Sequence, residues 1–287
     1  MARHGRHSRR SRAYRSRGRY GARVLDVGIV GFGAIGQVVA RELAASAACR
    51  VSSILVHPTA RPEVPEGTVL ATSVDELLAS EPSLVAECAG QGVVRQYGGQ
   101  ILAAGVDLMI ISTGALADEA TYERLQAAAR AGGSRMLLPA GATAGMDGLS
   151  ALRAGGLTRV RYTSTKPPGA WKGTEAEQLV ELGALTEPTV FYEGPAREAA
   201  QTFPKNANLA ATIALAGIGL DKTEIALVAN PAASGSTGRI EAEGLLGGLT
   251  VETWGEPSET NPKTSAVTAF SIVAAVESRQ ATVVLPA

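Results

Sequence analysis

The stretch VLDVGIVGFGAIGQVVARELAAS, residues 24–46, decides the fold. A short apolar, β-branched run is followed at once by GFGAIG and then by a helical pattern, which predicts a strand, a glycine turn and a helix. The first glycine permits the tight turn, the second lets the backbone approach a pyrophosphate, and the third permits close helix–strand packing. A glycine turn that only reverses the chain is the alternative. The predicted dinucleotide-binding residues of this corner are Gly31, Gly33, Ala34, Ile35 and Gly36.

A second apolar run, VSSILV at residues 51–56, follows at the distance that a βαβ unit requires. Sites specific for NAD usually place Asp or Glu at the end of this strand, where the carboxylate binds the ribose 2′-hydroxyl. Here the strand ends in Val56 and His57, with Arg61 nearby and no acid before Glu63. Because nothing in this segment repels a 2′-phosphate, we predict that NADP is accepted, alongside NAD. His57 is a candidate phosphate contact, and the alternative is an ordinary solvated loop residue.

The α/β alternation continues to about residue 141. Helical patterns occupy residues 74–80, 96–105 and 114–133, and apolar strand patterns occupy residues 83–90, 107–113 and 135–141. The fold class is therefore α/β, with a Rossmann-type doubly wound parallel sheet whose ligand lies beyond the carboxyl ends of the strands. Small residues at those ends let a nicotinamide and its ribose lie close to the backbone. The predicted cofactor residues at the strand ends are Ala89, Gly90, Thr113, Gly114 and Ala142.

From about residue 150 the pattern changes to strands with period-two stretches and polar turns. We expect an α+β domain with a mainly antiparallel sheet, covered by helices over 196–203 and 207–219. We assign 23–140 to the NAD(P)-binding domain, completed by the C-terminal helix within 262–287, and 141–261 to a substrate and dimerisation domain. The exposed face of the second sheet is a candidate interface of a homodimer. Strands are expected at 158–168, 189–194, 223–231, 238–244 and 248–255, and a closing helix at 263–278.

Composition limits the classes of protein that the chain can represent. The 287 residues are 45% hydrophobic and 19% charged, as in a globular protein and unlike a disordered chain. Two cysteines, Cys49 and Cys88, exclude a disulfide framework and favour a cytoplasmic setting. The sequence has no apolar run long enough to span a membrane, and no metal site is expected.

A net charge of zero conceals a basic tail on an acidic body. Residues 1–22 carry eight arginines and no acid, which leaves 19 basic against 27 acidic residues in the rest of the chain. Such a block has no apolar face to bury, so we expect it to be disordered. It is a candidate for contact with nucleic acid or another acidic surface. A solubilising extension or an over-called start codon are the alternatives.

Several further segments together resemble the L-aspartate dehydrogenase family. In the order and spacing typical of that family, the chain reads GFGAIG, ECAG, ISTGALAD, LLPAGATAGMD, RYTSTKPPGAW, PKNANLAATIALAGIGLD and NPKTSA. The resemblance covers residues 24–280 and implies an NAD(P)-dependent enzyme that interconverts L-aspartate and iminosuccinate, which hydrolyses to oxaloacetate and ammonia or enters pyridine-nucleotide biosynthesis. It also implies cofactor contacts at Ala142 and Asn208.

One position departs from the family pattern. Members carry a histidine, proposed as the catalytic acid/base, in the segment that reads NPAASGSTGRIEAEG here, residues 230–244. Its position is occupied by Gly238, and the only histidines of the chain are His4, His7 and His57. Loss of one acid/base group typically costs a factor of ~10²–10⁴ in rate. We therefore hypothesise a shift toward reduction of a preformed imine, or toward a substrate other than aspartate.

Lysines and hydroxyls are the candidate substitutes for the missing histidine. Lys205 and Lys166 are the predicted catalytic residues, because a lysine can bind a carboxylate or, if desolvated, titrate near neutrality. Lys172, close to Lys166 in the sequence, is a weaker candidate of the same kind. The hydroxyl candidates for a substrate or water contact are Thr165, Ser236 and Thr237, and Asn261 or Thr264 is expected near the start of the closing helix.

Three classes of function remain open at this point. The first is an amino-acid dehydrogenase of the aspartate dehydrogenase type, or an imine reductase with a different substrate. The second is a non-catalytic NAD(P)-binding protein, since the acid/base position is empty. The third is a nucleic-acid-associated protein in which the basic tail is the functional part.

Overall fold

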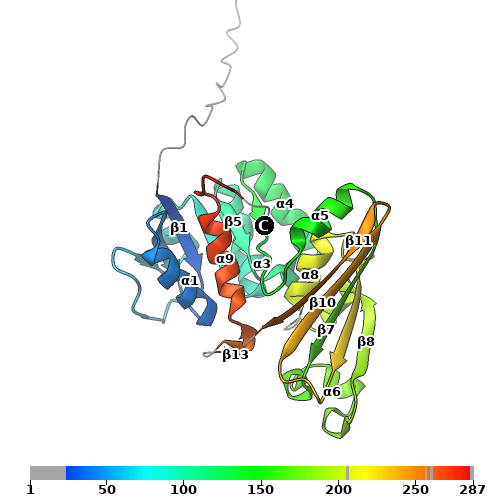
Figure 1. Cartoon of the computed structure of the whole chain (residues 1–287). Helices are drawn as coiled ribbons and strands as arrows, with labels where there is room; N and C mark the ends of the chain where they lie inside the picture. The colour runs from blue at the N-terminus through cyan, green and yellow to red at the C-terminus, as the bar shows by residue number, and fades with distance from the viewer. Residues whose placement is uncertain (1–23, 205–206, 256, 259–260, 285–287) are drawn as a thin grey trace, which may run out of the picture.

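The computed structural model describes residues 24–204, 207–255, 257–258 and 261–284 of the chain. The tail predicted at residues 1–22 and the candidate Lys205 lie outside the described residues. Within the described part, two sheets stand side by side, each with its own helices, and the chain returns to the first sheet at its end (Figure 1).

The first sheet has six parallel strands in the order β3-β2-β1-β4-β5-β6. This is the strand order of a dinucleotide-binding fold, with its switch point between β1 and β4. The predicted doubly wound parallel sheet is therefore confirmed. Its elements are β1 (Leu25–Val30), α1 (Ala34–Ala45), β2 (Cys49–Leu55), β3 (Val69–Ala71), α2 (Val74–Ala79), β4 (Leu84–Glu87), α3 (Gln91–Ala103), β5 (Asp107–Ile110), the 3₁₀ helix η1 (Thr113–Ala117), α4 (Glu119–Gly132) and β6 (Met136–Leu137).

Apolar side chains cover both faces of this sheet, as a buried parallel sheet requires. On one face, α1 packs against the closing helix α9 (Val267–Glu277), and residues such as Leu43 and Ile272 are fully buried there. On the other face, the core includes Leu77, Ile101 and Leu125 from α2, α3 and α4. The carboxyl ends of the strands are left open toward the second sheet (Figure 1).

The second sheet has five strands in the order β11-β10-β7-β9-β8. Three of its four strand pairs are antiparallel and β7–β9 is parallel, so the expected mainly antiparallel sheet is confirmed. Helices α5, α7 and α8 bury apolar residues against one face. The elements are α5 (Met146–Ala154), β7 (Leu157–Lys166), η2 (Pro168–Trp171), α6 (Ala176–Leu179), η3 (Leu182–Ala184), β8 (Thr189–Pro195), α7 (Ala196–Thr202), α8 (Ala207–Ala216), β9 (Glu224–Ala229), β10 (Ser236–Gly244) and β11 (Gly247–Gly255).

Two predicted helices of the first domain have different limits in the structure. The helix expected at 114–133 is split into η1 and α4, because Asp118 adopts extended backbone and its carboxylate accepts a hydrogen bond from the Thr121 N–H at 3.0 Å. Asp118 is thus the N-cap that begins α4. The helix expected at 96–105 begins at Gln91, directly after Gly90, whose φ of +133° allows the chain to turn there.

The closing helix also begins later than expected. Residues Asn261–Ser265 form strand β13, which pairs with β12 (Pro257–Ser258), and α9 starts only at Val267. A proline at position 262 disfavours helical backbone at the preceding residue, which is consistent with an extended start. Asn261 and Thr264 are therefore not at the helix N-terminus.

Candidate active site

The glycine corner joins β1 to α1 in the tight conformation that its sequence requires. Gly31 has a φ of +93°, and a Cβ at this residue would lie 2.6 Å from the Cβ of Ala89. A Cβ at Gly36 would lie 2.1 Å from the carbonyl oxygen of Gly31, so only glycine lets the helix pack this closely. A Cβ at Gly33, by contrast, would meet nothing within 4 Å, which leaves room for a ligand to approach the backbone.

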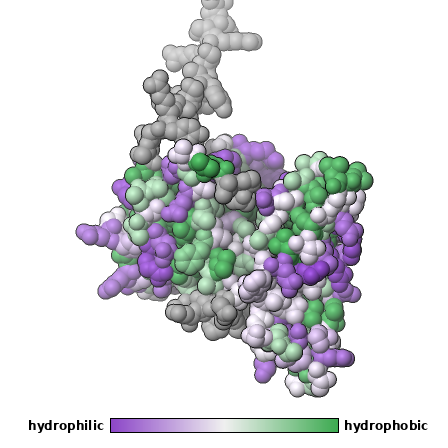
Figure 2. Space-filling model, in the orientation of Figure 1, coloured by the Kyte–Doolittle hydropathy of each residue, from purple (hydrophilic) through white to green (hydrophobic). Residues whose placement is uncertain are grey.

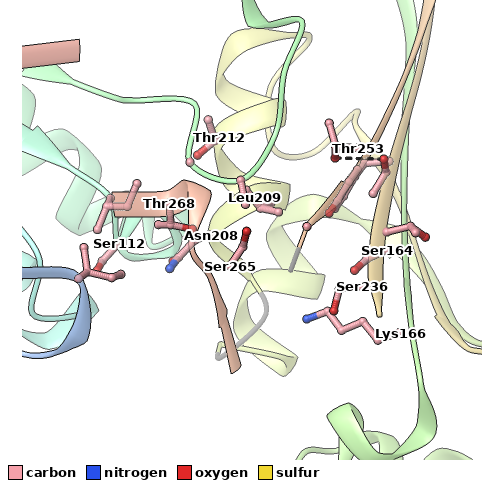
Figure 3. Close-up of a pocket in the computed structure, with 18 of the residues that line it drawn as sticks. Ser112, Ser164, Lys166, Asn208, Leu209, Thr212, Ser236, Thr253, Ser265 and Thr268 are labelled. Carbon is pink, nitrogen blue, oxygen red and sulfur yellow. Dashed lines mark hydrogen bonds between the residues drawn. The ribbon is translucent and has the colours of Figure 1, made fainter. Parts of the chain in front are cut away.

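A pocket of about 380 Å³ extends from this corner to the second sheet (Figure 3). It is walled by the helix start of α1, by the ends of β4 and β5, by α8, and by β7, β10 and β11. Its lining is Ala34, Ile35, Cys88, Ala89, Gly90, Ile111, Ser112, Gly141, Ala142, Tyr162, Ser164, Lys166, Asn208, Leu209, Thr212, Ser236, Thr237, Gly238, Thr253, Trp254, Gly255, Ser265 and Thr268.

Strand β7 presents a polar row to the pocket. Alternate residues of a strand share a face, and Tyr162, Ser164 and Lys166 all line the pocket from β7. Burial lowers the pKa of Lys166 to about 8. Its ammonium nitrogen lies 4.9 Å from the centroid of the Trp171 ring, a distance typical of a cation–π contact.

The other titratable groups among the described lining residues hold their protons near neutral pH. Burial raises the pKa of Tyr162 to about 12, and a side-chain hydrogen bond with Ser164 opposes that shift. Burial and the neighbouring Glu87 carboxylate raise the pKa of the Cys88 thiol well above its ordinary value. Lys166 is therefore the described lining residue whose charge changes near neutrality.

Hydrogen bonds connect α8 with the loop after β5. The Asn208 Oδ1 accepts the backbone N–H of Gly114 at 3.0 Å, and the Thr113 hydroxyl donates to the Asn208 carbonyl at 2.7 Å. Thr113 also shares a hydrogen bond with Thr212 at 2.9 Å. Because the amide oxygen of Asn208 is engaged in this way, its Nδ2 donor is turned toward the pocket (Figure 3).

Gly238 lines the pocket from β10, directly opposite Ser164 of β7. A Cβ at Gly238 would lie 3.0 Å from both the Cε2 and the hydroxyl oxygen of Tyr162, and 3.3 Å from the Thr253 hydroxyl. The Tyr162 ring therefore lies close beside the glycine, and a side chain at position 238 would require it to shift by a few tenths of an ångström.

The structure brings together some of the predicted site residues and leaves others outside. Five of the predicted cofactor residues line the pocket directly with Asn208, and Lys166 lines it from the second domain. Thr113 and Gly114 contact Asn208 without lining the pocket, and Gly31, Gly33 and Gly36 form the corner beside it. The five are Ala34, Ile35, Ala89, Gly90 and Ala142.

His57 and two of the weaker candidates do not line the pocket. His57 is exposed in the loop after β2, where its ring Nδ1 shares a 2.9 Å hydrogen bond with the Thr59 hydroxyl. Lys172 is exposed, and Thr165 alternates to the face of β7 opposite Lys166. Ser236 and Thr237 line the pocket.

Sequence reasoning missed several polar lining residues. Tyr162 and Ser164 were detectable, because they stand four and two residues before Lys166 on one predicted strand and therefore share its face. Thr253 and Ser265 reach the pocket only through the pairing of β11 with β10 and the turn of β13 toward α9. No local pattern in the sequence specifies these two placements.

The pocket has the features that a dinucleotide needs. The open space at Gly33 lies at the N-terminus of α1, where a helix favours phosphate. Ser265 lines the pocket, and its hydroxyl is buried without a hydrogen-bond partner in the described part of the chain, as a polar atom beside a ligand site can be. Together with Asn208 and the small residues at the strand ends, these groups fit an NAD(P) cofactor.

These features define a two-domain NAD(P)-dependent oxidoreductase, with the dinucleotide fold on one side of its pocket and a substrate domain on the other. Family models support both halves: residues 31–139 match the homoserine dehydrogenase NAD-binding domain, and residues 147–279 match the aspartate dehydrogenase C-terminal domain. The chain belongs to the aspartate dehydrogenase family. The resemblance seen in its motifs is thereby confirmed.

Individual relatives agree with this assignment. The chain is 44% identical to the L-aspartate dehydrogenase of Cupriavidus taiwanensis, and the match covers 89% of this chain and 98% of the relative. It is also 44% identical to the L-aspartate dehydrogenase of Cupriavidus necator, with the same coverage. The crystal structure of aspartate dehydrogenase from Thermotoga maritima superposes with a TM-score of 0.75 at 28% identity, covering 92% of this chain and all of that one.

Neither a membrane-spanning helix nor a metal-binding cluster occurs among the described residues. None of the described helices is both long and apolar enough to cross a bilayer. The described residues also contain no group of three or more His, Cys, Asp or Glu side chains arranged to hold a metal ion.

Proposed function

We propose that the chain interconverts L-aspartate and iminosuccinate in the pocket between its two domains, with NAD(P) lying along the glycine corner and the strand ends. The observation that carries this proposal is the continuity of one cavity from Ala34 and Ile35 to Lys166. It places a titratable cation at the far end of the space that fits the cofactor. Membership of the family and the names of the relatives support aspartate as the amino acid.

Lys166 is the proton acceptor of the oxidative direction in this proposal. The ammonium group of aspartate must lose a proton before its nitrogen can form a double bond to Cα, and neutral Lys166 takes that proton. Bound NAD(P)⁺ would supply the acceptor for the hydride that leaves Cα. In the reverse direction protonated Lys166 returns the proton to the amine nitrogen. The lowered pKa of Lys166, about 8, makes both of its charge states accessible near neutral pH.

Hydroxyl groups around Lys166 hold the substrate in this proposal. Tyr162 and Ser164 share the pocket face of β7 with Lys166, and Ser236 lines the pocket from the neighbouring strand β10. Hydroxyls donate to carboxylate oxygens, and a dicarboxylate offers four of these. Lys205 remains a second candidate for a carboxylate contact, since it is three residues before Asn208 in the sequence.

Asn208 and the strand-end residues hold the cofactor in this proposal. The Asn208 Nδ2 donor faces the pocket, and Ala89, Gly90 and Ala142 provide close backbone approach. At the other end of the cofactor, no acid follows β2 before Glu63, so NADP is accepted as well as NAD. His57 is the proposed contact of the 2′-phosphate.

Turnover with purified full-length protein tests the activity. L-aspartate with NAD⁺ or NADP⁺ is expected to yield reduced cofactor, and L-glutamate, L-alanine and D-aspartate serve as comparison substrates. Binding of reduced cofactor without turnover of any amino acid or imine would instead indicate a non-catalytic binding protein. Comparison of oxaloacetate plus ammonia with preformed iminosuccinate shows whether the absence of the histidine confines the enzyme to reduction of a preformed imine.

We also propose that the charged face of the second sheet is the interface of a homodimer. Arg159, Arg161 and Arg239 form ion pairs there with glutamates of the same sheet. A surface that carries both charges in alternation is complementary to its own copy about a twofold axis. Sedimentation is expected to give the mass of two chains. Arg161→Glu should shift the measured mass toward that of one chain, whereas Arg41→Glu on α1 should leave it unchanged. A wild-type monomer at micromolar concentration would overturn this proposal.

A cytoplasmic setting is the proposed location. Both described cysteines, Cys49 and Cys88, are free thiols. Free thiols are typical of proteins kept in a reducing compartment.

A further inference from the structure

Glu87 is a buried carboxylate at the open end of the first sheet. It is the last residue of β4, is 2% exposed, and pairs with Val30 of β1 and Ile110 of β5. Glu87 therefore ends the strand that lies between β1 and β5, at the edge of the sheet where the loops after β4 and β5 begin. A buried acid is uncommon unless its oxygens are satisfied, so its partners show what it does.

Four hydrogen bonds reach this carboxylate from two separate loops. Oε1 accepts the backbone N–H of Ala89 at 2.8 Å and of Gly90 at 2.6 Å, both from the loop between β4 and α3. The loop after β5 supplies the Ser112 hydroxyl to Oε1 at 2.9 Å and the Ser112 backbone N–H to Oε2 at 3.0 Å. Glu87 thus connects two loops that are otherwise separated by the whole of α3 and β5.

The contacts favour the ionised form of the side chain. Three of the four donors are backbone N–H groups, which can only donate, and the Ser112 hydroxyl is placed to donate as well. An ionised carboxylate accepts all four, whereas a protonated one would turn one oxygen into a donor. Burial raises the pKa of Glu87, and the hydrogen bonds from Gly90, Ser112 and Ala89 oppose that shift.

The loops that Glu87 connects form one wall of the pocket. Ala89, Gly90 and Ser112 all line it, although Glu87 itself does not. Gly90 has a φ of +133°, in the region that favours glycine. Because glycine can adopt many backbone conformations, hydrogen bonds to its backbone are needed to hold the loop in one of them. The hydrogen bonds to Glu87 supply that constraint.

We propose that Glu87 is a positioning residue for cofactor binding, which fixes the β4–α3 and β5–η1 loops at the spacing that receives the nicotinamide half of NAD(P). This inference rests on the proposed placement of the cofactor across the strand ends. Its specific consequence is that loss of the carboxylate weakens cofactor binding while substrate binding from the second domain is preserved.

The Glu87→Gln variant tests the proposal with little change of shape. Glutamine keeps one acceptor oxygen, but its amide nitrogen then faces either the Ser112 N–H or the two N–H groups of the other loop, donor against donor. An unsatisfied buried donor is costly enough to change an affinity by a factor of about ten or more. We therefore expect the KM for the cofactor to rise at least about tenfold and the KM for aspartate to change less than about threefold.

Two further variants make the result independent of whether Glu87→Gln folds well. Ser112→Ala removes the hydroxyl bond and keeps the other three, so it should raise the cofactor KM in the same direction by a smaller factor. Glu76→Gln is the matched control, because Glu76 also accepts a backbone N–H, from Thr72 at 2.7 Å, but on the surface. Its cofactor KM should equal that of the wild type.

The outcomes separate the inference from the function on which it rests. If the wild type turns over aspartate but Glu87→Gln and Ser112→Ala leave the cofactor KM unchanged, or raise both KM values equally, Glu87 is not a positioning residue for the cofactor. If titration with NAD⁺ and NADP⁺ shows that the wild type binds neither, the proposed function fails first.

Discussion

The ring of Tyr162 occupies the space that a side chain at Gly238 would need. These residues lie diagonally across the β7–β10 pair, and a Cβ at Gly238 would come within 3.0 Å of the tyrosine Cε2 and hydroxyl oxygen. The position where the family resemblance expects a histidine is therefore not an empty gap that awaits water. Gly238 lines the pocket beside a buried tyrosine and offers no acid/base group there, which leaves the other polar lining residues as candidates.

Gly238→Ala should destabilise the protein by about 1–3 kcal/mol, because the added methyl group overpacks against Tyr162. Gly183→Ala is the control, since a Cβ at Gly183 would meet nothing within 4 Å. Thermal or urea unfolding measures both. Because the hydroxyl is one of the two atoms in contact, Gly238→Ala combined with Tyr162→Phe should cost less than the sum of the single changes. Strict additivity would contradict the contact.

The contact with Tyr162 also affects a variant in which the histidine of the family is restored at position 238. Gly238→His alone should raise activity little, because its Cβ would already lie 3.0 Å from two atoms of Tyr162, which must shift to accommodate it. An increase in kcat for that single variant, with unfolding unchanged, would show that the tyrosine moves aside readily.

Lys166 should control the pH dependence of the oxidative reaction. Burial lowers its pKa to about 8, so the neutral form that accepts a proton becomes dominant above that pH and kcat/KM for aspartate should rise through it. Lys166→Met should lower kcat by a factor of ~10²–10⁴ and remove this limb of the profile. Lys172→Met, at an exposed lysine six residues away, is the control. It should retain both the wild-type kcat and the rise of kcat/KM with pH. An unchanged profile in Lys166→Met would assign the limb to another group.

The lowered pKa also has a consequence for stability. An unfolded chain protonates this lysine up to its ordinary pKa of 10.5, whereas the folded chain releases the proton near 8. The unfolded state therefore binds more protons between these values, and the free energy of unfolding should rise with pH across that window. Lys166→Met should flatten this rise in urea unfolding measured at pH 8 to 10.

Asn208 is expected to act on the cofactor through its amide nitrogen. Asn208→Asp keeps the oxygen that accepts the Gly114 N–H but replaces the pocket-facing donor with a second acceptor. The KM for the cofactor should rise about tenfold while the melting temperature stays close to that of the wild type. Asn230→Asp is the matched control, because Asn230 also accepts a backbone N–H, from Ala232 at 2.9 Å, in a loop outside the pocket lining. Equal effects of the two substitutions would contradict the assignment.

The sequence was sufficient to predict the first domain because its signals are local. The glycine corner, the apolar strands and the alternation of strand and helix are each specified within about twenty residues, and together they predict the doubly wound parallel sheet that is observed. Errors occurred where a single residue decides an element boundary. The carboxylate of Asp118 divides a continuous helical pattern in two, and the turn at Gly90 sets the start of α3.

The substrate side of the pocket was less predictable because it is assembled from distant segments. Lys166 was identifiable from the residue type and its motif, but its pKa depends on burial that only the folded chain supplies. Likewise, the relationship between Tyr162 and Gly238 depends on the register of β7 against β10, which no local pattern fixes. Glu87 is part of the ECAG motif, but the motif does not reveal its partner, because the hydrogen bonds from Ser112 join residues 25 positions apart.

Cofactor preference should be set by the loop after β2. No acid there competes with a 2′-phosphate, so kcat/KM with NADP should lie within about tenfold of that with NAD. His57→Asp supplies a carboxylate that accepts from a ribose 2′-hydroxyl and repels a phosphate. It should therefore lower kcat/KM for NADP by about tenfold or more while that for NAD is maintained or raised. His57→Asn, which adds the same length of side chain without charge, isolates the electrostatic part. If His57→Asp changes neither kcat/KM for NADP nor kcat/KM for NAD, the exposed histidine is only a loop residue hydrogen-bonded to Thr59, and the 2′-phosphate is bound elsewhere.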